Sequence, residues 1–132
     1  MQLTKRAFRA LAAPLLLLGL ATVARLAAQE ESTTLEGYVI DSSCAFTKKL
    51  DRPLSRECAM ACAKNGSQLV ILTSDGTIYW PISNKMPAQG QNARLTRFAG
   101  RRVKISGKLY KRGGSYALVV EEVAVLPSLM NR

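Results

Sequence analysis

The chain has 132 residues, with 19 Lys and Arg against nine Asp and Glu, a formal net charge of +10, three cysteines and no histidine. This length suits one domain. Because histidine is absent, the sequence excludes Ser-His-Asp and Cys-His catalytic arrangements and histidine-bound metals.

The first 28 residues have the pattern of a secretory signal peptide. Three basic residues precede an uncharged apolar run over residues 10–24, which is shorter than the roughly 20 residues of a membrane-spanning helix. We expect cleavage after Ala28, or alternatively after Ala24. The mature protein is then periplasmic or secreted, has no membrane span, and keeps 15 basic and nine acidic residues, a net charge of +6.

The mature chain is expected to form one domain. Residues 29–34 are polar and predict a flexible N-terminus, residues 35–126 hold all the strand patterns, and residues 127–132 form a tail. Within the domain, residues 42–66 interrupt the strand patterns as a cysteine-bearing excursion.

The first half of the domain predicts one strand and one helix. Residues 35–41 (LEGYVID) are rich in β-branched and aromatic side chains, which favour a strand. Residues 42–54 show no sustained period, which is typical of an irregular segment. Ser55 is a suitable cap for a short helix that ends at Asn65-Gly66.

A tight hairpin follows this helix. Residues 68–73 are apolar and β-branched, and residues 77–82 return after Asp75-Gly76, a dipeptide typical of hairpin turns. Pro81 has no amide proton to donate, so we expect the second strand to end there or to lie at a sheet edge.

A second helix and a second hairpin complete the domain. Asn92 is expected to cap a helix over residues 92–99. Residues 102–109 alternate between apolar and basic side chains, as in a strand with one buried face. Residues 115–125 pair back after a glycine turn, and the apolar phase changes across Glu121-Glu122, which indicates a β-bulge.

These elements predict a mainly β fold with two short helices. The order of strand, excursion, hairpin, helix and hairpin is that of an OB-like barrel, a small five-stranded Greek-key barrel. Other five-stranded barrels and sandwiches share this strand count.

The three cysteines predict a disulfide first. Thiols tend to be oxidised after export, and an odd number cannot all pair within one chain. Cys58 and Cys62 lie four residues apart on one helix face, where side-chain directions suit a disulfide poorly. We therefore expect Cys44 to pair with Cys58 or with Cys62, which leaves one thiol spare.

A metal site is the alternative. Cys44, Cys58 and Cys62 together form a candidate site for Cu(I) or Zn²⁺, and zinc would need a fourth ligand from Asp, Glu or water. Met60 is a possible thioether ligand but a badly directed one, because it is expected to point away from the face shared by Cys58 and Cys62. Their CxxxC spacing also differs from the CxxC of thioredoxin-type enzymes.

Nothing else in the sequence predicts catalysis. No nucleophile motif surrounds Ser42 or Ser43, no nucleotide-binding glycine pattern occurs, and Glu121 and Glu122 diverge as neighbours on a strand. Asp41 borders the cysteine region and is interpreted as a turn or cap residue. We expect a protein that is not an enzyme.

Basic residues around the fourth expected strand form a possible anion-binding surface. Exposed Lys and Arg also serve solubility and edge protection. Export disfavours a nucleic-acid ligand, so the expected partner is a protein or another anionic surface, and the oligomeric state stays open. The surface comprises Arg97, Arg101, Arg102, Lys104 and Lys108.

Four segments give the chain a resemblance to small exported bacterial proteins of uncharacterised function. They are GYVIDSSCAF (37–46), ECAMAC (57–62), LVILTSDGTIYWPISN (69–84) and FAGRRVKISGKL (98–109), and the likeness covers most of residues 35–125. The resemblance implies an OB-like barrel with a cysteine-bearing insertion after the first strand. It implies no catalytic residue.

The expected function is that of an exported, cysteine-stabilised OB-like binding or accessory domain, with residues 42–66 as its functional surface. A soft-metal-binding protein that uses the three cysteines is the alternative.

Overall fold

The structure is a computed structural model that describes residues 30–48 and 55–127. The expected signal peptide over residues 1–28, with both cleavage sites, lies outside the described residues, as do positions 49–54 of the excursion and 128–132 of the tail. No helix in the described part of the chain is long and apolar enough to cross a membrane.

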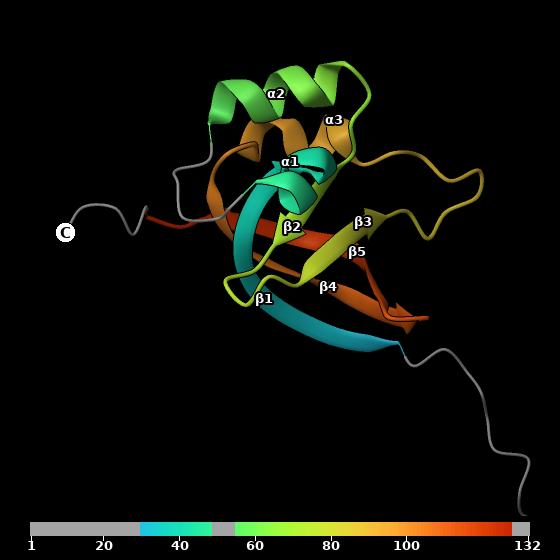
Figure 1. The fold of residues 1–132 in the computed structure, drawn as a ribbon. Helices are drawn as coiled ribbons and strands as arrows, with labels where there is room; N and C mark the ends of the chain where they lie inside the picture. The colour runs from blue at the N-terminus through green and yellow to red at the C-terminus, as the bar shows by residue number, and fades with distance from the viewer. Residues whose placement is uncertain (1–29, 49–54, 128–132) are drawn as a thin grey trace, which may run out of the picture.

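Five strands form a closed barrel in the order β1-β2-β3-β5-β4 (Figure 1). Neighbouring strands are antiparallel except β3 and β5, which are parallel. The mainly β fold class, with a five-stranded OB-like barrel, is therefore confirmed. The strands are β1 (Glu31–Asp41), β2 (Leu69–Leu72), β3 (Ile78–Ile82), β4 (Arg102–Arg112) and β5 (Ser115–Val125).

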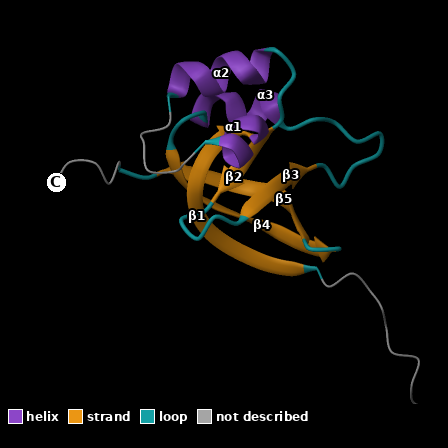
Figure 2. Cartoon of the chain, viewed as in Figure 1, coloured by secondary structure: helices purple, strands orange, loops and turns teal. Residues whose placement is uncertain are grey.

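The helices lie together at one end of this barrel (Figures 1 and 2). They are α1 (Ser42–Thr47), α2 (Arg56–Lys64) and α3 (Asn92–Leu95), which continues as the 3-10 turn η1 (Thr96–Phe98). The predicted helices correspond to α2 and to α3 with η1. α1 forms in the part of the excursion that the sequence predicts to be irregular. A helix of six residues is too short to show a period, so the sequence pattern does not reveal it.

The barrel interior is apolar. Alternate residues of β4 face inward as predicted, and Val103 and Ile105 are fully buried. The main core cluster also takes residues from the other strands and from the α3–η1 segment, while a smaller cluster of Ile40, Val70 and Leu72 lies beneath α1.

The first strand begins earlier than predicted. Residues 31–34 were expected to be part of a flexible N-terminus, but they pair with β4, from Glu31 opposite Leu109 to Thr34 opposite Ser106. Their side chains are mostly exposed and polar, so no apolar pattern marks them. Backbone pairing to the long β4 strand places them in the barrel.

Pro81 is the penultimate residue of β3, buried, and pairs with Leu118 of β5. The pairing of β3 with β2 stops at Tyr79, so β3 has no β2 partner at Pro81 and no ladder bond is lost on that side. One further local prediction is wrong. Asn92 does not cap its own helix. Its side chain accepts from the Leu69 amide (2.8 Å) and donates to the Ser67 carbonyl (2.7 Å), which ties α3 to the start of β2.

The predicted bulge is confirmed. Ser106 pairs with Glu122 and Gly107 pairs with Val120, so Glu121 has no partner on β4. The Arg94 guanidinium donates to the carbonyls of Val120 and Glu121 and so stabilises the distorted backbone.

Candidate thiol and carboxylate site

Asp41 is the last residue of β1 and is fully buried, at 0 % exposure. Its Oδ1 accepts from the Cys44 amide at 3.0 Å and from the Ser67 hydroxyl at 3.5 Å. Its Oδ2 is also buried but has no hydrogen-bond partner of ordinary geometry within the described residues. An unpaired buried carboxylate oxygen destabilises the fold unless something else compensates it.

Cys44 lies in the first turn of α1, directly above this carboxylate. Asp41 caps the helix through the Cys44 amide, so the cap itself holds the cysteine beside the acid. The Cys44 side chain is half-buried and packs against the smaller core cluster.

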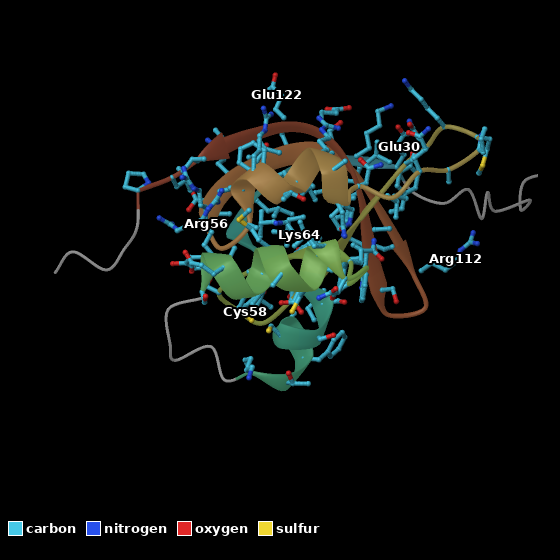
Figure 3. All side chains as sticks on the ribbon, turned by 90° about the horizontal axis from the view of Figure 1, so that it is seen from above. Glu30, Arg56, Cys58, Lys64, Arg112 and Glu122 are labelled. Carbon is cyan, nitrogen blue, oxygen red and sulfur yellow. The ribbon has the colours of Figure 1, made fainter. Side chains whose placement is uncertain are left out.

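The α2 helix supplies the other two cysteines. Ser55 caps this helix by accepting from the Cys58 amide at 3.2 Å, as predicted, and Ala59 faces the barrel core. Cys58 and Cys62 lie one turn apart and therefore on the same side of the helix. Figure 3 shows Cys58 on the side of α2 that faces α1.

Contacts with the α3–η1 segment hold α2 in this position. The Arg56 guanidinium donates to the carbonyls of Arg97 (3.2 Å) and Ala99 (3.0 Å). Gly100 allows the close approach, because a Cβ atom there would lie 2.6 Å from Cα of Arg56. The face of α2 that carries Cys58 and Cys62 is thus oriented by contacts between Arg56 and the backbone of residues 97–100.

The three thiols and the carboxylate interact electrostatically. Burial first, then hydrogen bonding and charge from Asp41, and then the Cys58 thiol together raise the pKa of Cys44 to about 12. Burial also raises the pKa of Cys62, followed by the charge of Asp41 and the Cys58 thiol. The fold therefore brings Cys44 and Cys62 within the influence of Asp41, and Cys58 within the influence of those two cysteines.

The cysteines are neither bonded to one another nor arranged as a finished metal cage. All three are free thiols, and no set of three ligating side chains is already assembled over residues 30–48 and 55–127. The expected disulfide between Cys44 and Cys58 or Cys62 is therefore not formed in this structure. What the structure provides is a set of three free thiols, two of which lie close enough to a buried carboxyl group to have a raised pKa.

A raised thiol pKa makes Cys44 a poor nucleophile near neutral pH, because the thiolate is the reactive form. We expect Cys44 to react with iodoacetamide at pH 8 about tenfold or more slowly in the folded, reduced, metal-free protein than in urea. Peptide mapping after timed quenching measures this rate, with the exposed Cys58 as the internal control. Equal Cys44 rates in the folded and unfolded chain would contradict the expectation.

Other side chains that could carry chemistry lie elsewhere. Met60 packs against the main barrel core, which agrees with its predicted direction away from the cysteines. Glu57 is exposed and accepts from the Ser55 hydroxyl, and Glu121 and Glu122 are exposed on β5. None of these side chains joins the cluster around Asp41.

The predicted basic surface is partly neutralised. Arg102 of β4 pairs with Glu36 of β1. Lys108 of β4 pairs with Glu30, the residue before β1. Arg97 lies over the ring of Phe98, with its guanidinium carbon 4.6 Å from the centroid. The two remaining members of the surface, both exposed, are Arg101 and Lys104.

Sequence reasoning missed the part that Asp41 and Ser67 take in the site. An Asp at the end of a strand, three residues before a Cys, is a common helix-cap pattern, and it is indeed a cap here. Its complete burial and its free oxygen follow from packing, which no local pattern records.

The chain matches no protein-family model, no curated protein and no solved structure. The chemistry of the site is thus the remaining guide to function.

Proposed function

We propose that this protein is an exported OB-like domain that binds a soft metal ion, Zn²⁺ or Cu(I), through Cys44, Cys58 and Cys62. One observation supports this most directly. Cys44 of α1 and Cys62 of α2 both interact with one buried carboxylate, and one oxygen of that carboxylate has no hydrogen-bond partner of ordinary geometry in the described residues.

Charge explains why this arrangement favours a metal. Asp41 is fully buried, and in the described residues only the Ser67 hydroxyl and the Cys44 amide donate to it with ordinary hydrogen-bond geometry. A bound cation would compensate the carboxylate and stabilise three thiolates, as soft sulfur ligands do for Cu(I) and Zn²⁺. No set of three ligating side chains is assembled in the described residues, so the thiols must move when a metal binds. Rotation about their side-chain bonds is the smallest such movement.

The test is the intact mass of protein exported from expressing cells, measured native and denatured, with and without an alkylating reagent. We expect one metal ion per chain in the native spectrum and three alkylations after denaturation. Metal analysis of the same sample identifies the ion. A two-proton mass deficit with one alkylation and no metal would instead show a disulfide and a spare thiol, and would contradict the proposal.

A cysteine-stabilised binding or accessory domain is the second candidate, with residues 42–66 as its surface. Phe46 of α1 supports it, because this side chain is 69 % exposed and lies 6.4 Å from the ring of Trp80. Trp80 is half-buried, so Phe46 is the exposed member, and an exposed aromatic side chain is typical of contact surfaces between proteins. The mass measurement separates the two candidates, because only the second is compatible with a disulfide.

A further inference from the structure

We infer that Oδ2 of Asp41 is the fourth ligand of the thiol site and that this oxygen raises the affinity of the site for Zn²⁺ relative to Cu(I). The inference rests on the proposed function and adds to it a ligand and a choice of metal.

The first support is the state of the carboxylate itself. Asp41 is the only polar or charged residue among the buried residues that the structure describes. Its Oδ2 is the only fully buried side-chain polar atom in those residues without a partner. Such an atom destabilises the folded state, and a bound cation would offset this cost.

The second support is how the other oxygen is held. Oδ1 accepts from the Cys44 amide and the Ser67 hydroxyl. The Ser67 hydroxyl in turn lies 3.4 Å from the Ser42 hydroxyl, and the Ser42 amide donates to the Gln68 carbonyl at 2.8 Å. Ligating carboxylates are commonly oriented in this way, with one oxygen hydrogen-bonded and the other left for the metal.

The third support is the position of the carboxylate relative to the thiols. Its charge and hydrogen bonding act on the thiols of both Cys44 and Cys62, which belong to different helices. Glu57, the other described acid on these helices, is exposed and is already bonded to Ser55. Asp41 is therefore the acid that the fold presents to the cysteines.

The ligand set decides between the two metals. Zn²⁺ takes four ligands in a tetrahedron and accepts carboxylate oxygen together with sulfur. Cu(I) is softer, is selected by thiolate and thioether ligands, and gains little from a carboxylate. Three sulfurs and one oxygen thus match Zn²⁺, whereas the sulfurs alone satisfy Cu(I).

The variant Asp41→Asn tests this inference. Asparagine keeps an oxygen that can accept from the Cys44 amide, so the cap survives, but an amide nitrogen replaces the ligating Oδ2. The exported protein is purified as the cell processes it, then reduced and freed of metal. It is titrated with Zn²⁺ and separately with Cu(I), each in competition with a chromophoric chelator of that metal. We expect zinc affinity to fall about tenfold or more and Cu(I) affinity to stay within about threefold.

The matched control is Asp75→Asn. Asp75 lies in the β2–β3 turn, where its Oδ1 also accepts from a backbone amide, that of Thr77 at 3.1 Å. We expect this variant to leave both affinities unchanged. Thermal unfolding of each metal-free variant shows whether the substitution has altered the fold.

The outcomes separate this inference from the proposed function. If the unsubstituted protein binds neither metal, both are wrong. If it binds metal but Asp41→Asn leaves zinc affinity unchanged, or weakens both metals equally, Asp41 is not a ligand and the thiol site stands without it. A fall in the ratio of zinc to Cu(I) affinity in Asp41→Asn alone supports the inference.

Discussion

Cys58→Ser is expected to remove high-affinity metal binding while leaving the barrel folded. The Cys58 thiol acts on both other cysteines, so it is the member that joins α1 and α2 in one site. The residue is exposed, which means that no core contact is lost. Removing a residue that only hydrogen-bonds to a metal ligand lowers metal affinity roughly 10- to 100-fold. Removing the ligand itself should lower it more. We expect a loss of about a hundredfold or more.

Met60→Leu is the matched control for this change. It also removes a sulfur atom from α2, but Met60 packs against the barrel core and a Leu there nearly conserves volume. Chelator competition with Zn²⁺ and Cu(I) on both variants measures the effect, and circular dichroism verifies the fold. If Met60→Leu weakened binding as much as Cys58→Ser, the assignment of the ligands would be wrong.

Gly107→Ala is expected to destabilise the barrel more than any other single methyl addition at a described glycine. A Cβ atom at Gly107 would lie 2.1 Å from the Val119 carbonyl oxygen, and backbone on β5 cannot yield as a flexible side chain can. Gly107 also borders the β-bulge, where β4 and β5 change register. We expect a loss of about 3 kcal/mol or more in the free energy of unfolding.

Gly90→Ala provides the comparison. A Cβ atom at Gly90 meets nothing within 4 Å, and its backbone lies outside the left-handed region. Its free energy of unfolding should stay within about 0.5 kcal/mol of the unsubstituted protein. Urea denaturation of both variants gives the values. Equal stability of the two would show that β4 and β5 do not approach each other as described.

Local chemistry in the sequence determined most of the barrel. Alternation along β4, the Asp75-Gly76 turn, the phase change at Glu121 and the Ser55 cap each arise from neighbouring residues, and each appears where it was predicted. Such features depend on backbone preferences and on which side chains share a face, and both can be read within a few residues.

Only the tertiary structure decided how distant residues are used. Residues 31–34 form a strand because β4 offers them backbone partners, and Asn92 bonds to the start of β2 because helix packing brings it there. Likewise, Asp41 reads locally as a cap, and only packing buries it with a free oxygen between the cysteines of two helices. The sequence by itself determined that three thiols are present and how they are spaced. The burial of Asp41, its oxygen without a partner and the approach of α1 to α2 depend on contacts between distant elements, and these contacts made the thiols a candidate site.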